Sequence, residues 1–240
     1  MIASPDYGTL KQVYSSTTAS AVLLFIRPTN FVVSFHVLSL GRFVRALSEH
    51  PDAIHGLAWV NENLFVTGCD AGVVVGHDLR SSRPAWSYNL SDALPPGAGA
   101  QKGICCLSLL GAGASPSSVP MVAGGLGGFV TIFNAATGQI FSHEKLHSDD
   151  VRSVCVSPAT ARTRGELSVD LLTGSYDSTA ALWRVTLDGS NRVRYEGSPR
   201  VLTGHTDKVL SVVPFFAGGR SAPDVLTTGA DGKVILWTLS

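Results

Sequence analysis

The sequence has no excess of charge of either sign, because 18 lysine and arginine residues balance 18 aspartate and glutamate residues. A balanced chain offers no field that would attract nucleic acid or anionic lipid. Nucleic acid is therefore not expected as a partner except through a complex. Long apolar runs are also lacking, since the longest, residues 21–26, is far below the roughly 20 residues that cross a bilayer. No membrane partner is expected.

Cysteine is scarce too, with four residues and no CxxC pairing. All four lie in apolar, strand-like runs, so we interpret them as buried small hydrophobic residues rather than as a metal site or disulfides. They are Cys69, Cys105, Cys106 and Cys155. No metal ion and no cofactor are predicted. The N-terminus carries Asp6 and lacks the basic and apolar segments of a signal peptide, so we expect a cytoplasmic or nuclear protein.

A two-part unit recurs along the chain. In its clearest copy, apolar residues follow His205 at four and seven positions, and a second segment, DVLTTGADGKVILW, closes on Trp237. The next clearest copy repeats these spacings from His147 and closes on Trp183 through DLLTGSYDSTAALW. Such self-similarity predicts a repeat architecture.

Two weaker copies precede these and start at His50 and Ala100. The four starts give units of about 47 to 58 residues, slightly above the roughly 40–45 of four-stranded repeats. The surplus lies in segments rich in Gly, Pro, Ala and Ser, which break strands and predict surface loops. Short runs of Val, Leu, Ile and Thr fill the rest without sustained helical periodicity, so the fold class is all-β. The predicted loops are residues 93–103, 110–120, 157–166 and 216–223.

These features resemble those of the WD-repeat family. The resemblance is carried by a Gly-His pair at His205, by a Thr-Gly pair in each clear copy, and by the six-residue spacings Asp231 to Trp237 and Asp177 to Trp183. The terminal aspartate that names the family is absent after both tryptophans. The resemblance covers residues 42–240 and implies a single WD-repeat β-propeller domain over residues 1–240. The implied blades are about residues 1–47, 48–98, 99–144, 145–200 and 201–240.

In this family a blade carries a hydrogen-bonded line of Asp, His, Ser or Thr, and Trp. Such groups satisfy one another when buried, which offsets the cost of placing them in an apolar blade. Carried over by position, the two structural tetrads are His205, Thr228, Asp231, Trp237 and His147, Thr173, Asp177, Trp183.

The other two copies carry less of this line. In the third copy the corresponding residues are His50, Thr67, Asp70 and, in the place of tryptophan, Gly76. In the fourth copy they are Ala100, Ala123, Gly127 and Phe133. We expect packing alone to hold that fourth copy.

Partner contacts in the family favour the residue just before the tetrad aspartate, on one rim of the propeller. Tyr176 is the strongest anchor at such a position, because tyrosine offers a wide contact area and a hydroxyl; the others are Ala230, Cys69 and Leu126. Charged residues after the turn histidines are expected to set partner choice. The candidate partner-binding rim is Tyr176, Asp149, Asp150, Arg152, Asp207 and Lys208. The alternative is that these are simply solvated rim residues.

The function predicted from these features is a non-catalytic scaffold that binds other proteins or peptides, or a subunit of a multiprotein assembly. The recurring His, Thr and Asp could also suggest a hydrolytic triad, but no GxSxG elbow accompanies them. Two alternatives remain open. One is a propeller hydrolase similar to the diphthine methyl esterase, suggested by GCDAGVVVGHDLR, GICCLSLL and GSYD. The other is a ribosome-biogenesis WD-repeat factor.

The two ends of the repeat array and one glycine-rich segment give three further expectations. Residues 9–16 alternate as an outer strand would, and we expect them to complete the last blade. About five blades are recognisable, where most family members close with seven, so we expect an incomplete ring. The glycine pairs at 124–125 and 127–128 are interpreted as a tight hairpin turn, because no GK[ST] follows them.

Overall fold

A computed structural model of the protein shows an all-β fold. This confirms the fold class predicted from the sequence. The structure describes residues 10–14, 22–27, 32–37, 42–47, 49–93, 103–111, 118–157, 161–163, 166–215 and 224–238. Ala100 and most of the four predicted loops lie outside these residues. Within them no helix is long and apolar enough to cross a membrane.

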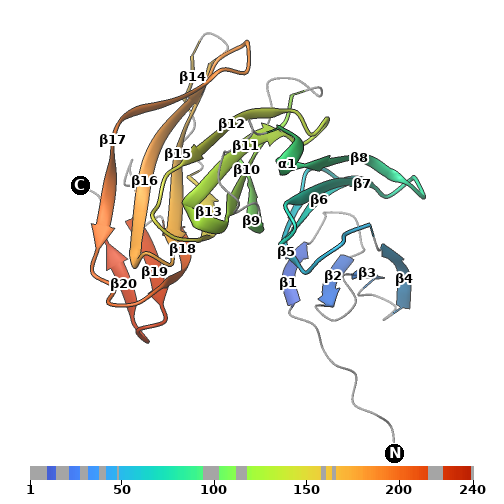
Figure 1. The fold of residues 1–240 in the computed structure, drawn as a ribbon, viewed down its shortest axis with the longest axis horizontal. Coiled ribbons are helices and arrows are strands. Elements are labelled where there is room, and N and C mark those ends of the chain that lie inside the picture. Colours follow the sequence, from blue (N-terminus) through green and yellow to red (C-terminus); the bar gives the residue numbers. More distant parts are fainter. Residues whose placement is uncertain are drawn as a thin grey trace, which may run out of the picture.

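Five antiparallel sheets follow one another along the chain, and each is called a blade and numbered in chain order (Figure 1). Blade 1 consists of β1 (Leu10–Tyr14), β2 (Val22–Arg27), β3 (Val32–Val37) and β4 (Arg42–Leu47). Blade 2 consists of β5 (Ile54–Trp59), β6 (Leu64–Cys69), β7 (Val73–Asp78) and β8 (Pro84–Asn89), followed by the short helix α1 (Leu90–Ala93). Blade 3 consists of β9 (Ile104–Leu109), β10 (Pro120–Gly125), the 3₁₀ turn η1 (Leu126–Gly128), β11 (Phe129–Asn134) and β12 (Ile140–Lys145).

The last two blades differ in size. Blade 4 consists of β13 (Val151–Val156), β14 (Ala161–Thr163), β15 (Glu166–Ser175), β16 (Thr179–Leu187) and β17 (Val193–Thr203). Its long strands project beyond the neighbouring blades, and β14 forms within a segment predicted as a loop (Figure 1). Blade 5 consists of β18 (Val209–Phe215), β19 (Asp224–Gly229) and β20 (Val234–Trp237).

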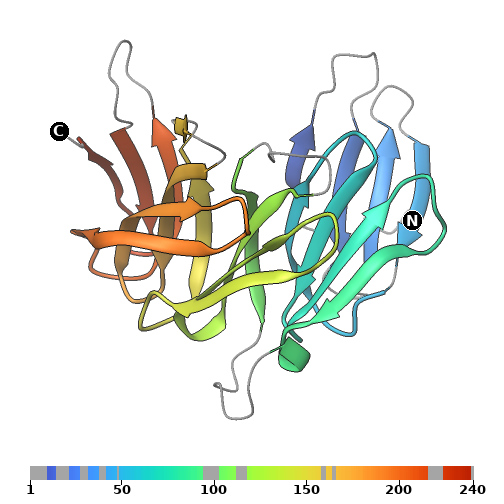
Figure 2. The same cartoon turned by 90° about the horizontal axis from the view of Figure 1, so that it is seen from above.

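The first strand of each blade lies against the first strand of the next from β5 through β9 and β13 to β18. The blades therefore stand side by side, as Figure 2 shows from above. The prediction that residues 9–16 complete the last blade is wrong, because β1 pairs with β2 inside blade 1. Pairing with the next strand in sequence closes a short loop, which costs less entropy than pairing with a strand more than 200 residues away.

Each seam between blades 2 to 5 closes on a glycine of the second strand. A Cβ at Gly68 or at Gly124 would overlap the next blade, on Ile104 and on Val151 respectively. Gly174 meets Val209 and Val212 of blade 5 in the same way. Apolar clusters with little or no solvent exposure surround these contacts at every one of these seams. Burial of apolar surface between blades is therefore the main stabilising term.

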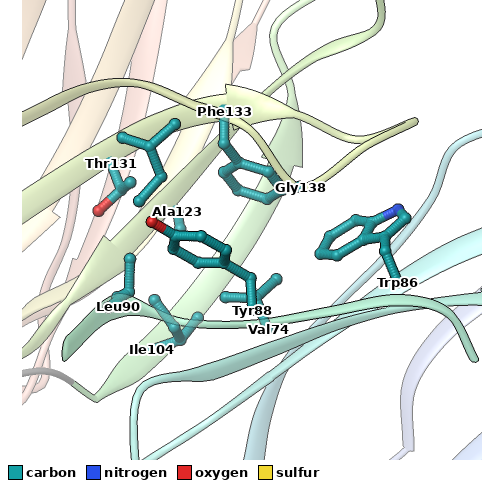
Figure 3. Close-up of a pocket in the computed structure, with 10 residues that line it drawn as sticks. Val74, Trp86, Tyr88, Leu90, Ile104, Ala123, Thr131, Phe133 and Gly138 are labelled. Atoms are coloured by element: carbon teal, nitrogen blue, oxygen red, sulfur yellow. The ribbon is translucent and has the colours of Figure 1, made fainter. Parts of the chain in front are cut away.

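The side chain of Trp86 in β8 packs between blade 2 and blade 3. Its indole lies on Gly76 and Gly138, where a Cβ would overlap the ring, and its Nε1–H donates to the Ala135 carbonyl at 3.0 Å. Figure 3 shows Trp86 beside Phe133 at the small apolar cavity of this seam. Gly76, assigned from the sequence to the tryptophan position of a tetrad, instead makes room for this indole.

Candidate functional site

A β-bulge interrupts the first strand of each of blades 2 to 5 at the same place. The pairing register skips one residue between Ile54 and Gly56, and equivalent skips occur in the other three blades. A bulge adds an unpaired residue and redirects its side chain. The bulged residues are His55, Cys105, Arg152 and Leu210.

In each of blades 2 to 5 the turn after the second strand docks beside this bulge. In blade 4 the Tyr176 amide donates to the Asp150 carbonyl at 2.9 Å, and in blade 5 the Ala230 amide donates to the Lys208 carbonyl at 2.8 Å. Blades 2 and 3 repeat the contact through Asp70 and Leu126. One rim therefore gathers a bulge residue and a turn residue from each of blades 2 to 5. Cys69, predicted at this rim, is instead fully buried, and its place is taken by Asp70.

Tyr176 lies at the centre of a cluster of charged residues on this rim. The Arg152 guanidinium carbon lies 4.6 Å from the centre of its ring, and the Lys208 ammonium of blade 5 lies 4.4 Å from it. Asp150 lies 3.5 Å from Arg152 and accepts the Gly127 amide of blade 3 at 2.8 Å. Blades 3, 4 and 5 thus meet around Asp150 and the partly exposed Tyr176. We call Tyr176, Arg152, Lys208 and Asp150 the rim cluster.

The two remaining predicted rim residues flank the cluster. Asp149 and Asp207 are both exposed, and each carboxylate accepts the next residue's amide at 2.7 Å. The Asp149 carbonyl also accepts the Ser175 hydroxyl at 2.8 Å. These bonds hold the loops that lead into the bulged strands of blades 4 and 5. Both carboxylates remain exposed to solvent.

Blade 4 brings together all four residues of its predicted tetrad. His147 bonds Asp177 through Nδ1 at 2.9 Å and Thr173 through Nε2 at 2.7 Å, and the Trp183 Nε1–H donates to the Thr173 hydroxyl at 3.0 Å. A neutral imidazole that donates from Nδ1 accepts at Nε2, so the line runs from indole to hydroxyl to imidazole to carboxylate. Burial opposes ionisation of Asp177, but bonds from Thr179, His147 and the Ser148 amide outweigh it and hold its pKa below the usual value.

Blade 5 corrects one predicted tetrad residue, because the hydroxyl belongs to Thr227 and not to Thr228. Thr227 is fully buried, lies 2.8 Å from His205 Nε2 and accepts the Trp237 Nε1–H at 2.9 Å. His205 Nδ1 bonds Asp231 at 3.0 Å.

Strand alternation explains the error. The tetrad hydroxyl stands four residues before the aspartate in both blades, as Thr173 does before Asp177 and Thr227 before Asp231. Thr228 occupies the next position, where the preceding blades carry their seam glycine, and successive side chains of a strand point to opposite faces. The Thr-Gly pair used for the alignment is therefore shifted by one residue in this blade.

We expect Thr227→Val to lower the free energy of unfolding by about 2 kcal/mol, because it removes the shared partner of two buried groups. Thr228→Val is the matched control and should change it by less than about 0.5 kcal/mol. Urea denaturation of both variants measures the difference. Equal losses would mean that the two threonines have been assigned the wrong roles.

In blade 2 a second histidine replaces the tetrad tryptophan. Thr67 lies 2.6 Å from His50 Nε2 and 2.8 Å from His77 Nε2. His77 stands ten residues after Thr67, the spacing of Thr173 to Trp183, so the signal was present in the sequence. Asp70, predicted here, instead pairs with the bulge residue His55 at 2.9 Å on the rim.

The tetrad aspartate position of blade 2 is Ala71, four residues after Thr67. His50 Nδ1 is buried and has no hydrogen-bond partner among the described residues. Burial lowers the pKa of His50 to about 4. Blade 2 therefore keeps the tetrad histidine without its carboxylate.

Blade 3 has Ala123 and Phe133 in tetrad positions, as predicted, and Gly127 in the turn. It is not held by packing alone: Thr131 and His143 Nδ1 lie 2.8 Å apart, and His143 stacks on Phe129 at 4.7 Å. Gly127 and Gly128 form the predicted tight turn with φ of 67° and 87°. Gly124 and Gly125, grouped with them in the sequence, lie in β10.

The described residues contain no group of three or more His, Cys, Asp or Glu side chains that could hold a metal ion. Cys69 and Cys105 are buried, Cys106 and Cys155 are partly buried, and none of the four forms a disulfide. Both ring nitrogens of His147 and of His205 are engaged inside the blades. A general base must reach its substrate's proton, and these imidazoles face blade residues instead.

Comparisons with known proteins agree with this arrangement. The family model described as "WD domain, G-beta repeat" matches residues 139–184 and 197–238. The WD40 β-propeller domain of Doa1 shares 14% identity over 94% of this chain and 62% of its own length, with a TM-score of 0.64. The computationally designed Ika8 protein shares 18% over 96% of this chain and 58% of its own, with a TM-score of 0.60.

A third structure, the computationally designed Ika4 protein, shares 20% identity over 81% of this chain and 96% of its own length, with a TM-score of 0.52. At these identities the likeness shows the fold alone. The chain spans about 60% of the length of the Ika8 and Doa1 structures.

Proposed function

Because the chain belongs to the WD-repeat β-propeller family, we propose that it is a non-catalytic module that binds other proteins or peptides through the rim cluster. Propellers of this family generally serve in protein interaction and scaffolding. A fold hosts many functions, so the proposal for this chain rests on its own side chains. A cytoplasmic or nuclear location stays a prediction.

The observation that supports the rim cluster is the position of Tyr176 between residues of two blades. Cations over its ring at 4.6 and 4.4 Å restrain the side chain before any partner arrives. A restrained aromatic side chain loses little conformational entropy on binding, which favours it as an anchor. The Asp149 and Asp207 carboxylates beside it add charges that can select among partners.

The tetrad contacts support a structural role for the histidines that suggested a hydrolase. The Thr173 and Thr227 hydroxyls are fully buried and share an indole and an imidazole, so neither is placed to attack a substrate. The predicted alternative of a propeller hydrolase therefore gains no support from these blades. Measurement of ester hydrolysis by the purified chain tests this directly.

Tyr176→Ala is expected to reduce capture of partner proteins at least about tenfold while leaving the urea midpoint close to wild type. The affinity-purified wild-type chain and the variant are compared by quantitative mass spectrometry of co-purifying proteins. Arg83→Ala, an exposed change in blade 2, is the control and should keep the wild-type set. An unchanged partner set for Tyr176→Ala would refute the rim proposal.

A further inference from the structure

A groove of about 420 Å³ opens at the seam between blades 3 and 4. One wall is the connection from β12 to β13, and the other is formed by β16 and β17. Its volume falls in the range of ligand-binding clefts in proteins, roughly 300–1,000 Å³. The apolar side of the groove is lined by Leu146, Ala181, Trp183, Pro199 and Val201.

The corresponding place at the seam of blades 2 and 3 is closed. Strand register makes Thr131 and Phe133 of blade 3 the equivalents of Ala181 and Trp183 in blade 4. Tyr88 of blade 2 and Leu90 of α1 cover them and leave a cavity of only about 10 Å³ (Figure 3). Blade packing therefore does not by itself produce a groove, and the seam of blades 3 and 4 differs in having no side chain among the described residues that fills it.

Strand β17 keeps this groove open. Leu182 pairs with Arg200 and Arg184 pairs with Glu196, so β17 carries two extra residues opposite Trp183. The bulge begins at Gly197, with φ of 68°, and turns Pro199 toward the groove. Val201 remains half exposed there, at 50%. Because β17 is the outer strand of blade 4, nothing within the described residues pairs with its far edge.

The charges around the groove favour an acidic occupant. Asp177, the acidic residue in its lining, already accepts bonds from His147, the Ser148 amide and Thr179. Lys145 is exposed, and its ammonium lies 5.9 Å from the centre of the Phe129 ring. The exposed charge in the groove lining is therefore the positive one of Lys145, whereas the Asp177 carboxylate is mostly buried and already bonded.

We propose that this groove binds an extended peptide segment of a partner protein in which an apolar side chain stands next to an aspartate or glutamate. The apolar side chain enters between Trp183, Pro199 and Val201. The acidic side chain pairs with Lys145 at the mouth. The proposal extends the function proposed above to a second surface, and it does not depend on the rim cluster.

Selection of a phage-displayed library of random seven-residue peptides on the immobilised chain tests the proposal. Peptides enriched on the wild type should place Leu, Ile, Met or Phe beside Asp or Glu. The charge-reversed variant Lys145→Glu should instead enrich Lys or Arg beside the apolar residue. Identical peptides from both proteins, or no enrichment on the wild type, would overturn the proposal.

Fluorescence polarisation of a labelled, wild-type-selected peptide then locates the site. Its affinity should fall about tenfold or more in Lys145→Glu and in Val201→Glu, both of which alter exposed residues. Arg83→Glu makes a matching charge change far along the chain and should leave the affinity unchanged. Tyr176→Ala should also leave it unchanged, so failure of the groove and failure of the rim cluster give different results.

Discussion

Replacing Gly128 with alanine is expected to lower the free energy of unfolding by about 4 kcal/mol or more. Gly128 has φ of 87°, and a Cβ there would overlap the carbonyl oxygen of His147. Its own carbonyl accepts the amides of Leu146 and His147 at 2.9 and 3.2 Å. The substitution therefore forces apart a turn of blade 3 and the tetrad histidine of blade 4. Urea denaturation followed by tryptophan fluorescence measures the loss.

Substitutions at two other glycines separate the backbone strain from the steric overlap with His147, the two contributions to this loss of stability. Gly232 has φ of 74°, but a Cβ added there would meet nothing within 4 Å, so Gly232→Ala reports backbone strain alone. Gly189 has neither a positive φ nor a neighbour, so Gly189→Ala should be close to neutral. We expect losses of about 1 kcal/mol and about 0 kcal/mol respectively. A Gly128→Ala loss no larger than that of Gly232→Ala would contradict the contact with His147.

The spacing of apolar residues predicted the strands of blades 2 to 5 well, because both faces of each sheet are buried and need apolar side chains at regular positions. The residues seven positions after His50, His147 and His205 each pair with the tetrad threonine of the next strand. Counting from these apolar residues across the hairpin gives Thr227, whereas counting from the Thr-Gly pair gives Thr228. Short motifs can slip by one residue, and in a strand such a slip reverses the face.

The rim could be predicted only in part, because β-bulges decide which side chains reach it. Arg152 and Lys208 were expected there from their place after the turn histidines, and both lie over Tyr176. His55 and Asp70 belong to the same rim, but the repeat alignment assigned Asp70 to a tetrad and gave no signal for His55. A bulge depends on how two strands pair, which is a tertiary property and leaves little trace in one strand's sequence. The groove beside Trp183 was missed for the same reason.

Blade 2 differs from blades 4 and 5 at two positions, and the two differences together explain why its histidine has no carboxylate partner. Ala71 stands where blades 4 and 5 have aspartate. Pro51 follows His50 at the position where Ser148 and Thr206 donate their amides to that aspartate. Proline has no amide hydrogen to donate. His50 is thereby left in a buried site with one bonded ring nitrogen.

Lowering the pH from 7.5 to 4.5 is expected to cost the protein about 2.5 kcal/mol through His50 alone. The unfolded chain binds a proton at the ordinary pKa of 6.5, whereas burial keeps the folded pKa at about 4. Stability is therefore complete above pH 6.5 and falls as the pH drops toward 4. Burial also lowers the pKa of His143, which acts in the same direction. Asp177 ionises below its usual range and so does not weaken the fold in this window.

Urea unfolding at a series of pH values, on wild type and three variants, isolates this contribution. His50→Gln should be less stable at neutral pH but should lose most of the decline toward pH 4.5, whereas His55→Gln on the rim should keep it. Ala71→Asp should reduce the decline, because a carboxylate beside Nδ1 favours the protonated ring and raises its pKa. Pro51 has no amide hydrogen, so that carboxylate would have fewer donors than Asp177 has. The pKa of His50 should therefore rise only part of the way, and some of the decline in stability should remain. A decline that is the same in His50→Gln as in wild type would assign the acid sensitivity to other groups.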